Sequence, residues 1–399
     1  MAAANDNGVG ARAMRVLLVI DELDVGGTEQ QIVELVRHLP RARWTPTVCC
    51  FRPGRKSAEI ERLGVRVVHL PKRGTVDPRL VRDLVSLMRA DRFDVVQTFL
   101  IGGNLWGRLA ALVAGVPVVI ASERNVDVWE EPTKRWLGLA LARVTDRIVA
   151  NAEAVRDYLI RRGADPKRVV TIRNGVDVSR FAAPVDRDAI RGELGLRPEH
   201  TVAAVVARLE PQKGQDVVIE VADRLCGRFP QLRWMLVGGG SAEPALRAEV
   251  ARRGLGDRVV FTGFRTDSAD LLRAADLSVL VSTKEGLSNT LLESLVAGLP
   301  VVASRVGGNA EVVATGAGLL VPPRDAHALE TAVELIAADP AAAARMGARG
   351  REHVRREFTV ARMVEQTAAL WDELLGLPAR RSAAPAAADE PTMRLEATR

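Results

Sequence analysis

Two glutamates, Glu285 and Glu293, lie close together in the segment LSVLVSTKEGLSNTLLESLVAG (277–298). The pattern predicts a buried strand that ends at Ser282, a polar loop that contains a glycine, and a helix that begins near Asn289. One glutamate then lies in the loop and the other just over one turn into the helix, so both can border one pocket. A carboxylate that accepts hydrogen bonds from two hydroxyls is a natural partner for a ribose or another sugar. The alternative is a pair of solvated surface charges.

The start of this predicted helix offers backbone donors to the same pocket. Asn289 can cap the helix, which leaves the N–H groups of Thr290 and Leu291 pointing outward from its first turn. Because these groups lie at the positive end of the helix dipole, they suit a phosphate.

Cations follow another strand at the start of the second half. A strand predicted at 201–207 ends at Arg208, and Lys213 begins the next helix after the residues LEPQ. A guanidinium and an ammonium at the end of a strand suit a diphosphate, although a solvated basic loop is the alternative. The glycine run 238–240 follows a strand predicted at 232–238 and indicates positive φ or a close backbone approach, for example by a sugar.

A glycine-rich turn, DVGGTE (24–29), lies between a strand predicted at 15–20 and a helix that begins near Thr28. Its two glycines permit a ligand to approach the backbone, and the helix N-terminus can bind an anion. The turn matches neither the dinucleotide fingerprint nor a P-loop. The alternative is an ordinary tight turn in which Thr28 caps the helix.

These turns must be held in place by strands, and short apolar runs alternate with helix-period segments along most of the chain. Strands are predicted near 15–20, 46–51, 65–70, 95–100, 116–122, 146–150, 168–173, 201–207, 232–238, 258–263, 277–282, 300–304 and 318–322. Helices close the chain near 325–338, 340–357 and 359–376. Alternating strands and helices predict parallel sheets, and an open sheet rarely exceeds about ten strands. We therefore predict two doubly wound α/β domains that divide after NGVD (174–177), within the strand-free stretch 178–200.

The composition excludes several other classes of protein. Of 399 residues, 47% are apolar and 27% charged, which is ordinary for a globular protein, and three cysteines do not make a disulfide scaffold. The first residues lack the apolar core of a signal peptide and no apolar run is long enough to span a membrane, so we expect a cytoplasmic protein. A net charge of +6 favours polyanionic ligands or an acidic membrane surface, while 4% aromatic residues disfavour nucleic-acid binding. The five histidines show no metal-ligand spacing.

Taken together, these features resemble the GT-B fold glycosyltransferases, specifically the large retaining family called glycosyltransferase family 4, or group 1. The resemblance covers about residues 14–376. It is carried by DVGGTEQ (24–30), VVTIRNGVD (169–177), ARLEPQKGQD (207–216), LVGGG (236–240), RVVFTGF (258–264), KEGLSNTLLESLVAGLPVVAS (284–304) and VGGNAEVV (306–313).

The resemblance implies two Rossmann-like domains that face each other across a cleft, with the last helix crossing back onto the first domain. The expected parts are a disordered N-terminus (1–13), an acceptor-side domain (14–185), a nucleotide-sugar-binding domain (186–358), the crossing helix (359–377) and a disordered tail (378–399).

The resemblance also implies a role for each motif residue. Expected to be catalytic are Glu285, Arg208 and Lys213. Expected at the diphosphate and ribose are Gly27, Arg208, Lys213, Asn289, Thr290, Leu291 and Glu293. Expected at the donor sugar or the base are Glu285, Gly239, Phe264 and Arg265, the last two mainly through their backbone. Expected on the acceptor side are Gly26, Thr28, Arg124 and Asn125.

One position departs from the family pattern. Family members often carry a histidine after the strand that corresponds to 116–122, and another where this chain has Gln97-Thr98-Phe99. Here the first position is Arg124, which cannot accept a proton near neutral pH. The role of the family histidine therefore stays unassigned.

The expected activity is retaining, metal-independent transfer of a hexose from a UDP- or GDP-sugar to a hydroxyl acceptor, with no cofactor, in surface polysaccharide or glycolipid assembly. The acceptor is expected at the loops 52–57, 72–78 and 100–107 of the first domain. Peripheral contact with the inner face of the plasma membrane is a further expectation, helped by Trp129 and Trp136, although a core helix at 136–141 is the alternative. Two other functions stay open: a non-catalytic nucleotide-sugar-binding partner of a transferase, and a UDP-sugar 2-epimerase.

Overall fold

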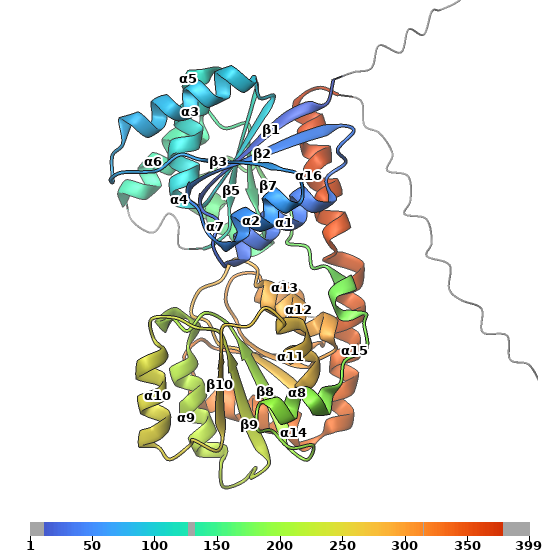
Figure 1. Ribbon diagram of the computed structural model, residues 1–399. Helices are drawn as coiled ribbons and strands as arrows, with labels where there is room; N and C mark the ends of the chain where they lie inside the picture. Colours follow the sequence, from blue (N-terminus) through green and yellow to red (C-terminus); the bar gives the residue numbers. More distant parts are fainter. Residues whose placement is uncertain (1–11, 127–131, 314, 378–399) are drawn as a thin grey trace, which may run out of the picture.

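Short runs of aliphatic and β-branched residues form two parallel sheets, which the computed structural model places in two domains joined end to end (Figure 1). The structure describes residues 12–126, 132–313 and 315–377, so the expected disordered tail lies outside the described residues, as does nearly all of the expected disordered N-terminus. Within the described residues, no helix combines the length and apolarity needed to cross a membrane.

The first sheet has seven strands in the order β3-β2-β1-β4-β5-β6-β7, and the second has six in the order β10-β9-β8-β11-β12-β13. The first contains β1 (Met14–Glu22), β2 (Trp44–Arg52), β3 (Arg66–His69), β4 (Val95–Phe99), β5 (Val118–Glu123), β6 (Arg147–Ala150) and β7 (Val169–Thr171). The second contains β8 (Thr201–Val206), β9 (Leu232–Val237), β10 (Val259–Gly263), β11 (Leu277–Leu280), β12 (Val301–Ser304) and β13 (Gly318–Val321). The predicted strands are confirmed, and so is the doubly wound fold. In each sheet the strand order reverses beside the first strand, and ligands of such folds bind at this switch point.

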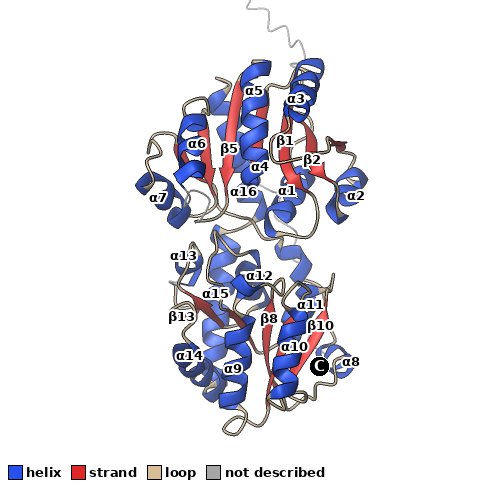
Figure 2. Cartoon of the chain, turned by 90° about the vertical axis from the view of Figure 1, so that its left-hand side faces the viewer, coloured by secondary structure: helices blue, strands red, loops and turns tan. Residues whose placement is uncertain are grey.

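Helices cover both faces of each sheet (Figure 2). The first domain carries α1 (Gly27–His38), α2 (Arg55–Arg62), α3 (Pro78–Asp91), α4 (Leu100–Gly102), the π-helical turn η1 (Gly103–Gly107), α5 (Arg108–Ala114), α6 (Pro132–Ala142) and α7 (Glu153–Arg161). The 3₁₀ turn η2 (Val178–Phe181) and α8 (Arg187–Glu193) connect the sheets. The rest are η3 (Pro211–Lys213), α9 (Gln215–Leu225), α10 (Glu243–Arg252), α11 (Ser268–Ala274), α12 (Asn289–Ala297), α13 (Asn309–Val313), α14 (Ala326–Ala338), α15 (Pro340–Glu357) and α16 (Val360–Leu374). The predicted loop 100–107 is instead helical, because α4, η1 and α5 follow one another without a break.

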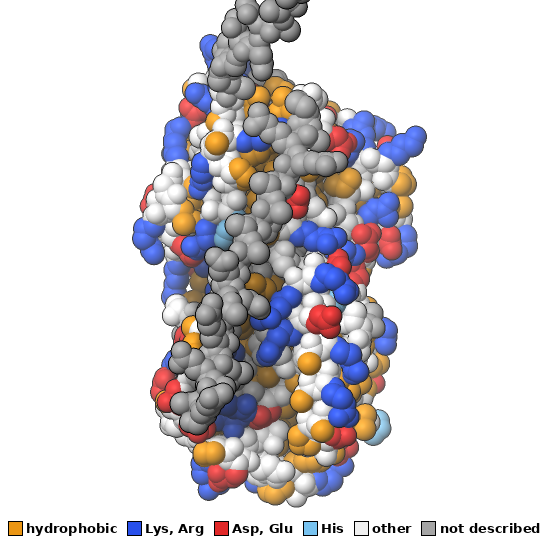
Figure 3. Space-filling model, turned by 90° about the vertical axis from the view of Figure 1, so that its right-hand side faces the viewer, with side chains coloured by type: hydrophobic (Ala, Val, Ile, Leu, Met, Phe, Trp, Pro, Cys, Tyr) orange, Lys and Arg blue, Asp and Glu red, His pale blue; other side chains and the backbone are white. Residues whose placement is uncertain are grey.

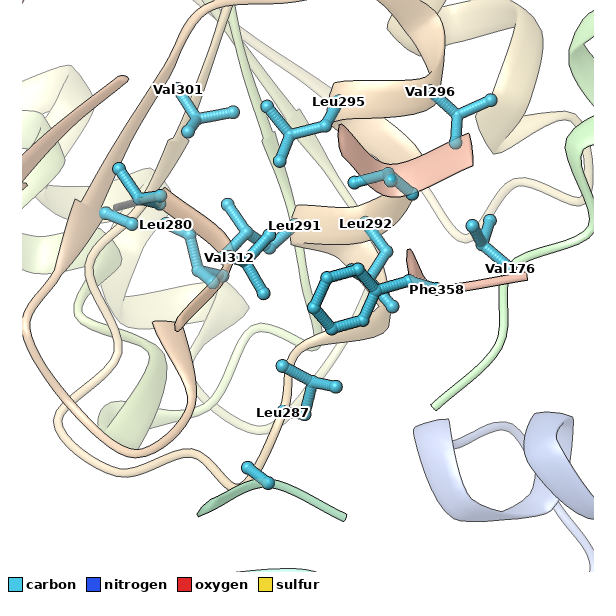
Figure 4. Packing of buried hydrophobic residues seen from close by; sticks show 14 of the residues in the cluster. Val176, Leu280, Leu287, Leu291, Leu292, Leu295, Val296, Val301, Val312 and Phe358 are labelled. Atoms are coloured by element: carbon cyan, nitrogen blue, oxygen red, sulfur yellow. The ribbon is translucent and has the colours of Figure 1, made fainter. Parts of the chain in front are cut away.

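The packing of α12 fixes the part of the second domain that faces the first domain. Its residues Leu291, Leu292 and Leu295 are buried and pack in one cluster with Leu280 of β11 and Phe358 (Figure 4). Burying one such leucine stabilises a fold by about 1.5–3 kcal/mol, so this helix is firmly seated on its sheet.

The last helix returns to the first domain, as Figure 1 shows for the red segment. The fully buried ring of Trp371 packs edge-on against Trp44 with centroids 5.0 Å apart, and its Nε1–H donates to Gln97 Oε1 at 2.9 Å. Arg43 pairs with Asp372 at 2.6 Å. The helix α16 is therefore bound to the first sheet by packing, a hydrogen bond and an ion pair.

Candidate active site

The candidate donor residues gather at the switch point of the second sheet. Arg208 and Lys213 follow β8, while Glu285 follows the adjacent strand β11 and Glu293 lies on α12. This edge faces the carboxyl ends of the first sheet's strands, and α12 lies next to the first domain (Figure 2). The fold thus brings together residues that the sequence separates by more than one βα unit.

Lys213 and Glu285 form a close ion pair. The lysine Nζ lies 2.6 Å from Glu285 Oε1, and only 17% and 12% of the two side chains are exposed. The two loops are also joined where the Thr283 N–H donates to the Gln212 carbonyl at 2.8 Å. Because the ammonium has three hydrogens and the carboxylate four lone pairs, both groups can contact a ligand without losing each other. The sequence placed both residues in the site but did not predict this pairing.

Glu293 is paired with a residue that the sequence reasoning missed. Arg180, in the connecting turn η2, places its Nη1 3.0 Å from Glu293 Oε1. Burial raises the pKa of the Glu293 carboxyl, and the nearby Arg180 guanidinium opposes that shift. In the sequence, the only indication of this partner is an arginine in the segment VSRF, which follows NGVD.

The start of α12 differs from the predicted one. Ser288, not Asn289, caps the helix: it has extended backbone angles, and its Oγ accepts from the Leu291 N–H at 3.3 Å. The Leu291 N–H expected to meet a phosphate is therefore engaged by Ser288 in this structure. Asn289 is the first helical residue, and Thr290 follows it in the first turn.

The Asn289 side chain instead reaches across to the first domain. Its Nδ2 donates to the Gly27 carbonyl at 2.9 Å, and its Oδ1 accepts from Asn174 at 2.7 Å and from Gln31 at 3.3 Å. Asn174 also donates to the Leu287 carbonyl at 2.9 Å. Asn289 is thus the centre of a hydrogen-bond network between the two domains.

The glycine-rich turn of the first domain opens α1 without a side-chain cap. The helix begins at Gly27 with Gly26 in the cap position, so the alternative in which Thr28 caps it is wrong. A Cβ atom on Gly26 would lie 2.2 Å from Glu29 Oε2, which means that this glycine makes room for the glutamate. Burial raises the pKa of the Glu29 carboxyl, while Arg124 and Arg208 act against the shift.

Arg124 lies half-buried at the junction of the domains. Its guanidinium donates to Asn174 Oδ1, and burial lowers its pKa to about 10, so it remains a cation at neutral pH. A Cβ on Gly286 would lie 2.1 Å from the Arg124 carbonyl oxygen, which shows how closely the loop of Glu285 approaches. Asn125 turns back on its own chain and accepts from the Val126 N–H at 2.8 Å.

The glycine run after β9 supports the loop of Arg208. Gly238 has φ +136°, and a Cβ there would lie 2.1 Å from the Ala207 carbonyl, while one on Gly240 would lie 2.3 Å from the Leu209 carbonyl. The predicted positive φ and close approach are confirmed, but the approaching group is the chain's own backbone. A Cβ on Gly239 would have its nearest contact with Glu243 at 3.7 Å, so no close approach explains that glycine.

The two residues expected near the base differ in their contacts. Phe264 is 45% exposed, and the Arg55 guanidinium of the first domain lies 4.5 Å from its ring centroid. Arg265 forms ion pairs with Asp267 at 2.6 Å and with Glu193 at 2.5 Å. Its side chain is thus fully engaged, in keeping with a contact through the backbone.

Comparison with known proteins identifies the family. Residues 25–180 match the family described as Glycosyltransferase Family 4, and residues 186–353 match Glycosyl transferases group 1. The D-inositol 3-phosphate glycosyltransferase of Kribbella flavida is 32% identical over 373 residues, which cover 83% of this chain and 87% of that protein. The enzyme of the same name from Rhodococcus opacus is 35% identical over 260 residues, and this match spans 60% of the chain but only 58% of the relative.

The fold likeness extends over nearly the whole chain. The structure of Anabaena HepE in complex with UDP-glucose has a TM-score of 0.82 at 24% identity and covers 90% of this chain and 100% of that one. The two parallel sheets, their facing switch points and the two family matches agree with one another. The chain belongs to the group 1, family 4 glycosyltransferases.

Proposed function

We propose that this protein is a retaining glycosyltransferase that moves a hexose from a UDP- or GDP-sugar to a hydroxyl acceptor without a metal ion. The observation that carries the proposal is the Lys213–Glu285 pair at the switch point of the second sheet, with the Gly26–Gly27 turn of the first domain held close by Asn289. A donor in this position has a cation beside its diphosphate and a carboxylate beside its sugar.

The departing nucleoside diphosphate is the charge that the site must stabilise. Lys213 and Arg208 supply two positive charges at the ends of β8 and η3, and the N-terminus of α12 adds its dipole. Within the described residues, no group of three or more His, Cys, Asp or Glu side chains is arranged to hold a metal. We assign the charge stabilisation to these two side chains and the helix because their positive charge lies where the diphosphate is proposed to bind.

The proposed reaction needs no protein base. Arg124 is a cation, so it cannot take the proton of the acceptor hydroxyl. On a front-face path, the bond between the anomeric carbon and the diphosphate oxygen breaks, and the acceptor oxygen attacks the same face. The leaving phosphate oxygen takes the acceptor's proton. Glu285 orients the donor sugar, and the anomeric configuration is kept.

The relatives narrow the proposed substrates. Anabaena HepE was solved with UDP-glucose, which favours a uridine nucleotide, and the Kribbella flavida enzyme is named for D-inositol 3-phosphate. We propose a UDP-hexose donor first and a GDP-hexose second. A phosphorylated polyol or a growing polysaccharide or glycolipid is the proposed acceptor.

Peripheral membrane contact is part of the proposal. Trp136 on α6 is 70% exposed, whereas Gly138 and Leu141 are buried and Leu139 packs against the core, so the core-helix alternative holds for the segment after Trp136. Trp129 lies outside the described residues. On the face seen in Figure 3, Lys and Arg side chains lie among Asp and Glu side chains. Co-sedimentation with acidic liposomes at low salt tests this membrane contact. If the protein does not sediment with the liposomes, membrane contact is no longer part of the proposal.

The test of the function is transfer from a panel of UDP- and GDP-hexoses to inositol phosphates and glycolipid acceptors, with and without a chelator. We expect a product whose anomeric configuration, read by NMR, equals that of the donor, at the same rate with the chelator. Conversion of a UDP-sugar without any acceptor would indicate the epimerase, and donor binding without turnover would indicate a non-catalytic partner.

A further inference from the structure

We infer that Arg180, on the turn that connects the two sheets, is a positioning residue that holds the Glu293 carboxylate in the orientation and charge state needed to bind the ribose of the donor. This inference rests on the proposed function, because it takes Glu293 as the ribose ligand. Arg180 lies outside the strand-to-helix turns and the helix N-terminus that supply the other proposed donor ligands.

The turn η2 holds Arg180 rigidly in place. Asp177 caps it by accepting from the Ser179 N–H at 2.9 Å and from its hydroxyl at 2.6 Å. Phe181 at its end is buried in the same core cluster as Leu291 and Leu292 of α12. The guanidinium therefore reaches Glu293 from a turn that is anchored on the same core as the carboxylate's own helix.

The contact leaves the carboxylate able to bind a ligand. Arg180 Nη1 lies 3.0 Å from Oε1 of Glu293, whose side chain is 15% exposed. A carboxylate has about four lone pairs, so after accepting from Arg180 it can still accept from the two hydroxyls of a ribose. A protonated carboxyl loses part of this capacity.

The surroundings of Glu293 make the arginine necessary. Charged groups face the carboxylate from three elements: Arg180 on η2, Glu34 on α1 and Lys56 on α2. Glu34 repels it, and Lys56 places its Nζ 2.8 Å from Glu59, which takes much of its charge. Of these three groups, Arg180 is the one that forms an ion pair with Glu293 in the described part of the chain. Without it, burial would raise the pKa of the Glu293 carboxyl further.

The experiment compares UDP with 2′,3′-dideoxy-UDP by titration calorimetry on the full chain and on two variants. In the parent we expect UDP to bind at least tenfold more tightly, because only UDP has the ribose hydroxyls. In Arg180→Gln we expect UDP affinity to fall by about 10-fold or more, from the loss of a charge-assisted interaction, with dideoxy-UDP affinity unchanged. Arg180→Lys should recover much of the loss, since it keeps the positive charge.

The pH dependence separates positioning from general damage to the structure. Removing Arg180 raises the pKa of Glu293 further, so the carboxyl protonates at a higher pH. As the pH falls, Arg180→Gln should then lose its preference for UDP at a higher pH than the parent does. A purely structural role would weaken both nucleotides equally at every pH.

Arg187→Gln is the matched control, because Arg187 lies in the same segment between the two sheets, at the start of α8, but pairs with Asp276 instead of Glu293. It should bind both nucleotides as the parent does. The inference would be overturned if Arg180→Gln still prefers UDP over dideoxy-UDP as strongly as the parent does. It would also be overturned if the variant loses affinity equally for both nucleotides. Neither result would affect the proposed function. Absence of UDP binding in the parent would instead overturn the donor site itself. If Arg180→Gln fails to fold, Arg180→Lys decides: a preference for UDP over dideoxy-UDP close to that of the parent would support the inference, and equal affinity for the two nucleotides would exclude a role for the charge.

Discussion

The two sides of the cleft hold their polar groups in different ways. On the second domain, Lys213 and Glu285 are the two halves of a largely buried ion pair on neighbouring turns of one sheet. On the first domain, Gly27 and Arg124 are engaged mainly by the amide side chains of Asn289 and Asn174, which join the domains. The charged groups of the second domain are thus held in place by each other, within one sheet. Those of the first domain are held where this domain meets the second.

Changing Glu285 should have the largest effect of all, on the reaction rather than on binding. Glu285→Gln keeps the shape of the side chain but loses its charge, and we expect kcat to fall by about 10²–10³-fold, as for other groups that act on the transition state. Donor affinity should stay nearly intact. The control is Glu243→Gln, whose carboxylate pairs with Arg247 on the surface of α10. Equal rates for Glu285→Gln and the parent would refute the role of Glu285.

Changing Lys213 should weaken donor binding itself. Lys213→Ala removes a charge from the diphosphate site and leaves Glu285 unpaired, so we expect the Kd for UDP to rise by about 10–100-fold. Lys167, exposed in the turn before β7, gives the matched control Lys167→Ala, which should bind UDP normally. Calorimetry measures the Kd for UDP in both variants. An unchanged Kd in Lys213→Ala would show that the diphosphate binds elsewhere.

The contacts between the domains should matter less than either charge. Asn289→Ala removes hydrogen bonds to Gly27 and Asn174, each worth about 1 kcal/mol net, so we expect kcat/KM to fall by about tenfold. The radius of gyration from small-angle scattering should rise as the domains separate. Gln231→Ala, in the exposed turn before β9, should change neither quantity. A parent-like radius and rate in Asn289→Ala would show that this network does not hold the cleft.

The crossing helix should affect stability and leave the chemistry nearly unchanged. Trp371→Phe keeps most of the packing but leaves the buried Gln97 Oε1 without its donor, which costs about 1–3 kcal/mol of unfolding free energy. Donor affinity should not change. Denaturant unfolding measures the loss, and Trp136→Phe on the exposed part of α6 serves as the control with no expected loss. Equal stabilities would show that the Gln97 contact is not maintained in solution.

The sequence was sufficient to predict the strands and to bring Lys213 and Glu285 to one edge of the sheet, for a physical reason. Parallel strands buried on both faces are continuous apolar runs, and their carboxyl ends must meet at one edge, so the residues after β8 and β11 could be placed together. Contacts between the domains carry no such periodic signal. Asn289 was therefore predicted as a helix cap although Ser288 takes that role, and Arg180 was not predicted at all.

The glycine positions illustrate the same limit. The run after β9 was correctly predicted to need close approach, but the sequence cannot say whether the approaching group is a ligand or the chain's own Ala207 carbonyl. Gly26 likewise makes room for Glu29, a residue of the DVGGTEQ motif to which the sequence had given no role. A glycine in the sequence can indicate that another group approaches the backbone closely, but only the structure identifies that group.

The most direct test of the central claim is a thermal-shift titration of the parent and Lys213→Ala with UDP, GDP and ADP in the presence of a chelator. Ligand at 100 times its Kd stabilises the folded state by about 2.7 kcal/mol, so a binder raises the Tm measurably. We expect a clear shift of the Tm with either UDP or GDP in the parent and a much smaller shift in Lys213→Ala. No shift with any of the three at millimolar concentration, or equal shifts in both proteins, would contradict a donor site built on Lys213 and Glu285.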